Sequence, residues 1–197
     1  MATRLLVSVA ISAVTLGVGG AGGASLQVVN GCVIEPHAHC VGADLRGANL
    51  AHANLAHANL QHAKLQGAHL PNANLEDADL DKADLTGANL ALANLSHAYL
   101  NGVKFDRADL TGARIRYSSL DDAHFAYATL HRTDLYRSKI DDAVFARADL
   151  TSANLSNTSL AYTSLQHAVL TGINLTGALL CRTVMPDGAT NNSGCPK

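Results

Sequence analysis

The sequence contains no tryptophan, few other aromatic residues and almost no excess of charge of either sign. An ordinary globular core is close-packed from large side chains of varied shape, but here the apolar residues are mostly leucine and alanine. That bias predicts one small core cross-section that is repeated many times along the chain. The formal net charge of −2 excludes a strong field that would attract nucleic acid or imitate it.

A period of five residues runs through the chain from Leu45 to Leu180 without an insertion or deletion. Every fifth residue is large and apolar, and the residue two places before it is small, usually alanine. Leucines at this spacing would spiral around an α-helix and would alternate between the two faces of a strand. They are buried together only if the backbone turns a corner every five residues. Four such corners close a square coil of twenty residues.

Deviations from this pattern recur at intervals of twenty residues. The three phenylalanines of the chain are Phe105, Phe125 and Phe145. In the column of small residues, Ser118 and Ser138 replace alanine at the same interval. Stacked coils touch at like positions, so an unusual residue is best matched by an equivalent one in the next coil. This observation predicts four sides independently of the fivefold period.

Residues 43–47 (Ala-Asp-Leu-Arg-Gly) and 48–52 (Ala-Asn-Leu-Ala-His) resemble the A(D/N)LXX units of the pentapeptide-repeat family, and the resemblance covers most of the chain. It implies an all-β fold: a right-handed quadrilateral (four-sided) parallel β-helix solenoid with the central Leu or Phe and the preceding small residue inside. About seven coils spaced by about 4.8 Å give a rod of roughly 30 Å. We expect the repeats to occupy residues 43–182, with an N-terminal cap at 25–42 and a C-terminal cap at 183–197 covering the open edges.

The four cysteines are confined to the two ends of the repeat region, Cys32 and Cys40 before it and Cys181 and Cys195 after it. An even number placed in this way predicts two disulfides and an oxidising compartment. A rigid rod would hold the two ends much farther apart than the roughly 7 Å Cα limit of a disulfide. We therefore favour Cys32–Cys40 and Cys181–Cys195. Free buried thiols are the alternative, and a metal site, to which two nearby histidines could contribute, is disfavoured by the absence of a close CxxC spacing.

The first 24 residues have the pattern of a secretory signal peptide. Arg4 is followed by an uncharged apolar run from Leu5 to about Gly20, and small residues continue to Ala24. The run is shorter than the roughly 20 apolar residues that a spanning helix needs. We expect cleavage near Ala24, a secreted or cell-envelope protein, and no stable membrane insertion after removal of the signal. An uncleaved membrane anchor is the alternative.

Ten histidines raise the question of a metal site. His52, His57 and His62 are five residues apart, so they would lie at successive corners and point outward in different directions. They could not converge on one ion. We expect solvated corner residues, and neither a metal nor a cofactor.

The second half of the repeat region has the more varied exterior. The candidates for an interaction surface are Arg107, Tyr127, Arg147, Arg116, Tyr136, Tyr117 and Arg137. In the twenty-residue columns, Tyr127 lies between two arginines, Arg116 lies one coil from Tyr136, and Tyr117 lies one coil from Arg137. This order predicts cation–π contacts, and arginine and tyrosine are enriched at interfaces. The alternative is that long side chains only cover the corners of the rod.

Four aspartates are also stacked by the twenty-residue period. Asp121 and Asp122 are predicted to lie directly under Asp141 and Asp142. Carboxylate oxygens are the ligands that hard cations prefer. Weak binding of a cation at this patch is therefore a hypothesis.

Nothing in the sequence forms a catalytic arrangement, so we expect no enzyme. No Ser, Cys or Lys is paired with a His and a carboxylate as a relay, and leucine and alanine fill the interior without leaving a pocket. The interpretation is a non-enzymatic secreted scaffold that binds an unidentified macromolecular partner, a protein, through its side faces. Neither nucleic acid nor a small-molecule substrate is expected.

The family resemblance implies one alternative function, a DNA mimic acting on DNA gyrase (topoisomerase) of the quinolone-resistance type. Such mimicry needs a strongly acidic surface in place of phosphates and a cytoplasmic protein, and the small net charge and the export signal argue against both. Ice binding by a flat threonine array is a third class. Thr151 and Thr171 would stack, but Asp106 and His131 interrupt neighbouring positions.

Overall fold

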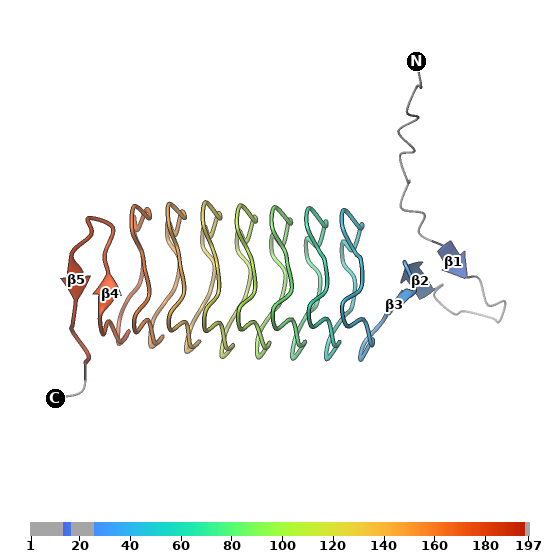
Figure 1. Ribbon diagram of the computed structural model, residues 1–197, viewed down its shortest axis with the longest axis horizontal. Coiled ribbons are helices and arrows are strands. Elements are labelled where there is room, and N and C mark those ends of the chain that lie inside the picture. Colours follow the sequence, from blue (N-terminus) through green and yellow to red (C-terminus); the bar gives the residue numbers. More distant parts are fainter. Residues whose placement is uncertain (1–13, 17–25, 196–197) are drawn as a thin grey trace, which may run out of the picture.

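The computed structural model describes residues 14–16 and 26–195, which form a rod with a small cap at each end (Figure 1). Its named strands belong to the two end regions: β1 (Val14–Leu16), β2 (Leu26–Val29), β3 (Cys32–Ile34), β4 (Thr183–Val184) and β5 (Thr190–Asn191). Within the described ranges, no helix is long and apolar enough to cross a membrane.

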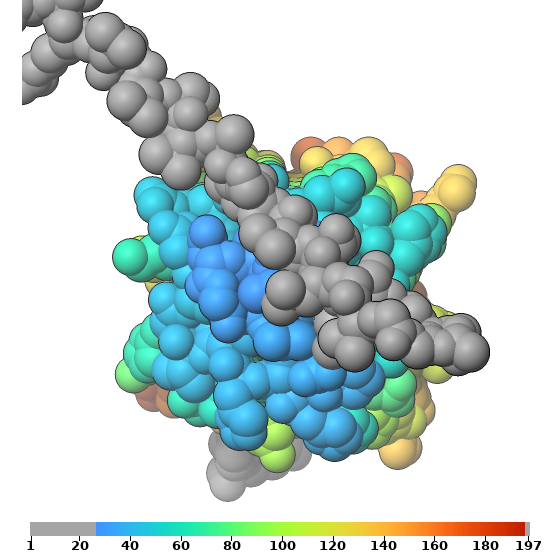
Figure 2. All heavy atoms as spheres, turned by 90° about the vertical axis from the view of Figure 1, so that its right-hand side faces the viewer, coloured from blue at the N-terminus to red at the C-terminus, as the bar shows by residue number. Residues whose placement is uncertain are grey.

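The rod is built from twenty-residue coils. Parallel β-bridges join residues twenty apart, beginning with His39 and Asn59 and continuing as far as Val184. Each coil donates backbone hydrogen bonds to the next; for example, the amide of Leu50 donates to the carbonyl oxygen of His69 at 2.7 Å. Viewed along the rod from its N-terminal end, the molecule has a blunt, four-cornered outline (Figure 2). The predicted four-sided coil is therefore present, and its sides are single bridges rather than long strands.

Each corner is a β-turn whose third residue has a positive φ. The carbonyl oxygen of Leu45 accepts from the amide of Ala48 at 3.1 Å, and the residue between them, Gly47, has φ of 62°. This is the pattern of a type II turn. Glycine adopts this conformation without strain, and Asn, Asp and His tolerate it better than other side chains do. The conformation explains the predicted corner histidines, because His52 and His57 both have φ of 58° at this position.

The Asp or Asn that precedes each central leucine caps the following corner. The Oδ1 atom of Asn49 accepts from the amide of Ala51 at 3.3 Å, and Oδ1 of Asp109 accepts from the amide of Thr111 at 2.9 Å. Short polar side chains make this local bond to the backbone two residues on. The recurring D/N of the repeat therefore supports the turn that follows it.

The core is a column of leucines and small residues. The central apolar residues from Leu45 to Leu165, Leu75 among them, are fully buried, and the predicted phenylalanine stack is present. The ring centroids of Phe105 and Phe125 are 5.2 Å apart, and those of Phe125 and Phe145 are 4.4 Å apart. The hydroxyl groups in the small column are also buried but satisfied, since Ser118 Oγ donates to the carbonyl oxygen of Leu95 at 2.9 Å. Burial of these hydroxyls therefore leaves no polar group unpaired.

A hairpin covers the N-terminal end of the rod. Strands β2 and β3 pair antiparallel, with β1 on the other edge of β2. Asn30 and Gly31, which join β2 to β3, both have positive φ, the combination that a type I′ hairpin turn requires. Asn30 Nδ2 donates to the carbonyl oxygen of Asp44 at 2.7 Å, and Gln27 Nε2 donates to that of Asn49 at 2.8 Å. These side chains satisfy carbonyl groups on the open edge of the first coil.

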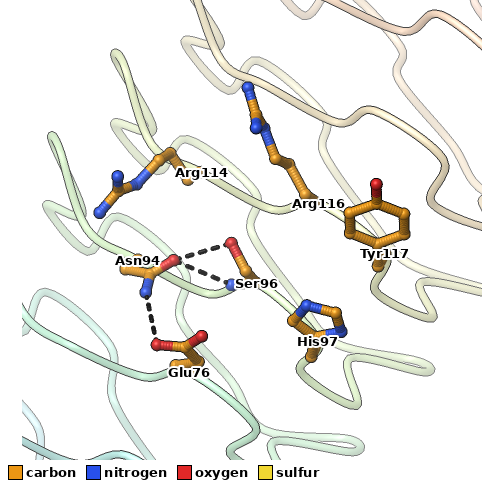
Figure 3. Close-up of a pocket in the computed structure, with 7 residues that line it drawn as sticks. All are labelled: Glu76, Asn94, Ser96, His97, Arg114, Arg116 and Tyr117. Atoms are coloured by element: carbon orange, nitrogen blue, oxygen red, sulfur yellow. Dashed lines mark hydrogen bonds between the residues drawn. The ribbon is translucent and has the colours of Figure 1, made fainter.

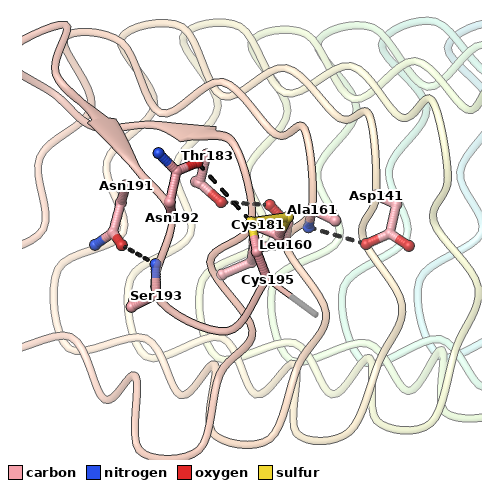
Figure 4. The surroundings of a disulfide bond; sticks show 9 residues. All are labelled: Asp141, Leu160, Ala161, Cys181, Thr183, Asn191, Asn192, Ser193 and Cys195. Carbon is pink, nitrogen blue, oxygen red and sulfur yellow. Dashed lines mark hydrogen bonds between the residues drawn. A yellow bond between two sulfur atoms is a disulfide. The ribbon is translucent and has the colours of Figure 1, made fainter. Parts of the chain in front are cut away.

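A second hairpin, β4–β5, covers part of the C-terminal end (Figure 4). The amide of Leu180 donates to the carbonyl oxygen of Ser193 at 2.9 Å. A disulfide joins Cys181 to Cys195, whose Cα atoms are 4.6 Å apart. The structure thus pairs the C-terminal cysteines as the sequence indicates.

The other disulfide lies at the opposite end. Cys32 of β3 is bonded to Cys40, with their Cα atoms 5.3 Å apart. Cys40 occupies the position of a central leucine and is buried. Because His39 already forms a bridge to the next coil, the rod begins one side earlier than the leucine pattern indicates.

Candidate functional site

The seven candidate interaction residues form two separate clusters. The Tyr127 corner consists of Arg107, Tyr127 and Arg147. The Tyr117 corner consists of Arg116, Tyr117, Tyr136 and Arg137. The two columns are two sides apart on a four-sided coil, so they lie on diagonally opposite edges of the rod. They are therefore two surfaces.

At the Tyr127 corner the structure has the contacts that the twenty-residue columns predict. The Cζ atoms of Arg107 and Arg147 lie 6.0 and 5.7 Å from the ring centroid of Tyr127. Arg147 also donates to the Tyr127 hydroxyl at 3.4 Å. Tyr127 remains 53% exposed. The result is an aromatic ring held between two cations on an outer edge.

At the Tyr117 corner the pairing differs from the predicted columns. Among the residues that the structure describes, no cation–π contact joins Arg116 to Tyr136; the Nε atom of Arg116 donates to Oδ2 of Asp134 at 2.6 Å. The Asp134 carboxylate raises the pKa of the Arg116 guanidinium above its usual value. Arg116 therefore serves first as the partner of a neighbouring carboxylate.

The aromatic residues of the Tyr117 corner pack on one another. The His97 and Tyr117 rings are stacked with centroids 5.2 Å apart, and Tyr136 meets Tyr117 edge-on at 5.7 Å. The Arg137 guanidinium lies over Tyr136, with Cζ 5.4 Å from the ring centroid. This corner presents a continuous aromatic surface with a cation at its edge.

The three residues of the Tyr127 corner share a left-handed backbone conformation, which the side-chain pattern does not reveal. Arg107, Tyr127 and Arg147 have φ of 58–59°. The same column holds only glycine in the first half of the rod, at positions 47, 67 and 87. A side chain in this left-handed region costs roughly 1–2 kcal/mol relative to the ordinary conformation. Within this column, therefore, the first half of the rod avoids the strain and the second half accepts it to carry arginine and tyrosine. Other columns accept it in the first half as well, for example at His52 and Lys82.

Two of the four stacked aspartates, Asp121 and Asp141, share one lysine from the adjoining side of the rod. Lys139 Nζ pairs with Asp121 and lies 3.5 Å from Oδ2 of Asp141. The hydrogen bond to Asp121 raises the lysine's pKa. Asp141 Oδ1 also accepts from Ser159 Oγ at 2.5 Å. It accepts from the amide of Ala161 at 3.0 Å as well (Figure 4). No group of three or more His, Cys, Asp or Glu in the described ranges could hold a metal ion.

Acidic residues do not form a line along the rod. On one side, Asp44, Lys64, Asp84 and Lys104 follow one another in successive coils. Arg46 donates two hydrogen bonds to Asp44 and lowers the pKa of that carboxyl to about 2. This column alternates in charge, unlike the uniform row of phosphates on DNA.

The outer surface has grooves that were not expected from the sequence, and one of them lies beside the Tyr117 corner. Seven residues line it: Glu76, Asn94, Ser96, His97, Arg114, Arg116 and Tyr117 (Figure 3). Its volume is about 360 Å³. The leucine and alanine pattern predicts a filled interior without a pocket, whereas this groove lies on the outer surface of the rod.

Several solved structures of pentapeptide repeat proteins are similar to the chain. HetL, involved in heterocyst differentiation regulation in the cyanobacterium Nostoc sp. strain PCC 7120, is 29% identical; the match covers 79% of this chain and 86% of HetL, with a TM-score of 0.43. Trypsin-treated QnrB1, a plasmid-mediated fluoroquinolone resistance protein, is 18% identical over 60% of this chain and 65% of that one, with a TM-score of 0.38. A protein from the Arabidopsis thaliana thylakoid lumen is 23% identical over 60% and 69%, with a TM-score of 0.29.

No curated protein shows a significant sequence match to the chain. A family model described as pentapeptide repeats matches in eight copies, over residues 38–77, 70–107, 104–142 and 138–177. These matches follow one another through the whole rod and share its fivefold period. The chain therefore belongs to the pentapeptide-repeat family.

Proposed function

We propose that the protein is an exported, non-enzymatic scaffold, a rod of about seven right-handed coils at roughly 4.8 Å each, that binds a partner protein through the Tyr127 corner. The observation that carries the proposal is the change of residue type within one column. Gly67 and Gly87 form the corner in the first half of the rod, and Tyr127 and Arg147 form it in the second half.

The rod does not need these large side chains for its own packing. Glycine closes the same corner elsewhere with no strain, and Tyr127 lies outside the core. Strained residues persist where a function uses them. Tyrosine and arginine are also the residue types that most often dominate the binding energy of interfaces.

The geometry of the corner suits recognition of an acidic surface. Within the described ranges, neither Arg107 nor Arg147 forms an ion pair, so both guanidiniums remain available to carboxylates. The Tyr127 ring is held between them, which reduces the entropy lost when a partner immobilises it. The Tyr127 corner has three such side chains, whereas each partner in a stable complex contributes roughly 20–30 residues. We therefore expect a transient complex unless an adjoining side also contributes.

Export is supported by the two disulfides. Each disulfide joins an end cap to the body of the rod, and bonds of this kind persist in oxidising compartments. The proposed signal peptide, residues 1–24, includes positions outside the described ranges.

The test uses a photo-crosslinking amino acid in place of Tyr127 in the native host. The matched control places it at Gly67, which lies in the same column of the first half of the rod. We expect a defined crosslinked protein only with the first variant, and we expect it to disappear when Arg107 and Arg147 are both changed to glycine. These glycine changes restore the low-strain corner, so loss of the crosslink without loss of thermal stability identifies a binding role. Equal crosslinking at positions 67 and 127 would refute the proposal.

A further inference from the structure

Arg114 interrupts a ladder of asparagine side chains on one side of the rod. Nδ2 of Asn74 donates to Oδ1 of Asn54 at 3.2 Å, and Nδ2 of Asn94 donates to Oδ1 of Asn74 at 3.3 Å. The next position is Arg114. The ladder resumes at Asn154, which donates to the aspartate below it at 3.0 Å. An amide at position 114 would continue the ladder, and the arginine does not.

The interruption lies in the surface groove of about 360 Å³, named here the Arg114 groove. Its residues come from three successive coils: Glu76 from the first, Asn94, Ser96 and His97 from the second, and Arg114, Arg116 and Tyr117 from the third. Figure 3 shows the two arginines toward one end and Glu76 toward the other. Two coil spacings separate these ends by about 10 Å of rod length.

The two ends of the groove differ in charge. Arg114 forms no ion pair with any residue that the structure describes, whereas Arg116 is bonded to Asp134 through Nε and one terminal nitrogen. A guanidinium has five N–H donors, so Arg116 also retains donors. At the opposite end Glu76 contributes a carboxylate, and its Oε2 accepts from Asn94 Nδ2 at 3.2 Å. A ligand that satisfies both ends must carry an anion at one end and hydrogen-bond donors at the other.

The wall between the ends is aromatic and braced. His97 and Tyr117 are stacked within 9° of parallel, and Tyr136 supports Tyr117 from the side. Such stacking limits the movement of both rings. On the floor, Ser96 Oγ donates to Oδ1 of Asn94 at 2.8 Å, which fixes the amide orientation. The groove is therefore largely formed before any ligand arrives.

We propose that the Arg114 groove binds a sugar acid, either free or as one unit of an acidic polysaccharide. The ligand's carboxylate binds Arg114 and the remaining donors of Arg116, a strong charge-assisted contact. Its hydroxyl groups donate to Glu76 and hydrogen-bond Ser96, while its ring lies against Tyr117. A free phosphate ion is too short to reach both ends and is repelled by Glu76. A neutral sugar leaves the arginine without its anion.

The experiment is titration calorimetry on the purified disulfide-bonded protein, with D-glucuronate, D-glucose and inorganic phosphate as probes. We expect saturable binding of glucuronate, with glucose and phosphate at least tenfold weaker. Arg114→Asn should weaken glucuronate binding at least tenfold while the protein stays folded, because the asparagine ladder then continues. Lys104→Asn is the matched control, because it removes one positive charge at the same position of a repeat unit on the opposite side of the rod, and it should leave the affinity unchanged.

A second arm identifies the source of the sugar acid. Tighter binding of a trigalacturonate than of galacturonate indicates a polysaccharide unit, and equal binding indicates a free sugar acid; either result supports the site. The proposal is overturned if wild-type protein does not bind glucuronate, if phosphate binds as tightly, or if Arg114→Asn and Lys104→Asn weaken binding equally. It does not depend on the Tyr127 corner, so each proposal can fail without the other.

Discussion

The corner position with positive φ allows the energetics of the coil to be tested by two opposite substitutions. Gly67 has φ of 64°, and a Cβ atom added there would meet no atom within 4 Å. Gly67→Ala therefore introduces backbone strain without a steric clash. Lys82 has φ of 58° and an exposed side chain. Lys82→Gly removes the corresponding strain at an equivalent corner.

The magnitude follows from two opposing terms. The left-handed conformation costs a side-chain-bearing residue roughly 1–2 kcal/mol, whereas replacing glycine lowers the entropy of the unfolded chain and stabilises by about 0.4–1 kcal/mol. Gly67→Ala should therefore reduce the free energy of unfolding by about 0.5–1 kcal/mol. Lys82→Gly should increase it by a similar amount. For a chain of this size, about 1 kcal/mol corresponds to a change in Tm of roughly 2–4 °C.

Thermal unfolding followed by circular dichroism measures both changes. The control is Ala91→Gly, at a corner position that lacks a positive φ, where glycine brings only its entropic penalty and should lower Tm. The reasoning predicts opposite signs for two substitutions to glycine that lie close together in the chain. If Lys82→Gly lowers Tm as much as Ala91→Gly does, left-handed strain does not govern these corners, and the argument for the Tyr127 corner loses its basis.

Four further outcomes can be measured directly. Leu75→Arg should destabilise the rod by several kcal/mol, because it places an unpaired charge in a fully buried position. The exposed control Gln166→Arg should change stability by less than about 0.5 kcal/mol. Equal Tm values for the two variants would contradict the assignment of inner and outer positions. Arg114→Asn should raise the free energy of unfolding by about 1 kcal/mol in denaturant titrations, since one side-chain hydrogen bond is added to the ladder, and no change would mean that the ladder does not form through this position. Mass spectrometry of the exported protein should find a chain starting near Ser25 without free thiols, and a retained signal or a labelled thiol would refute this. The protein should neither inhibit DNA gyrase nor rescue it from a quinolone in supercoiling assays, because its acidic residues are interrupted along the rod, by Lys64 after Asp44 and by Thr129 after Asp109. Salt-sensitive binding to gyrase would show this wrong.

The core could be predicted because its positions are a direct consequence of the fivefold period. Leucines at that spacing have one way to be buried together, and Leu75 and Leu90 are fully buried in the structure. The twenty-residue recurrence of Phe105 and Phe125 similarly fixed the number of sides, since the two rings are in contact. Both inferences depend on repetition, which averages out the ambiguity of any single residue.

The left-handed corners were missed, although the sequence contained a signal for them. Within the repeats, glycine occurs at a single phase of the five-residue unit, as at positions 67, 87 and 102. That restriction indicates a positive φ. The N-terminal hairpin was also signalled by the Asn30-Gly31 dipeptide between valine-rich segments. The glycines were assigned to corners and the Asn30-Gly31 dipeptide to an end region, and no backbone conformation was predicted for either.

The lateral contacts of the surface depend on a spacing of eighteen residues, which columns of twenty do not reveal. Arg116 bonds Asp134, and Lys139 bonds Asp121, in each case across eighteen positions. The reason lies in the turn: the Asp134 side chain leans toward its own following corner, where Oδ1 accepts from the amide of Tyr136 at 3.1 Å. Arg116 lies one coil before that corner, so its guanidinium reaches the Asp134 carboxylate before it reaches the Tyr136 ring. The Asn94 side chain is inclined in the same way, and its Nδ2 donates to Glu76. Arg114 has no short polar side chain that could cap a turn, and it is directed into the groove. In this rod the fivefold period decides what is buried, whereas the surface chemistry is decided by which residues preceding a leucine can cap the next corner.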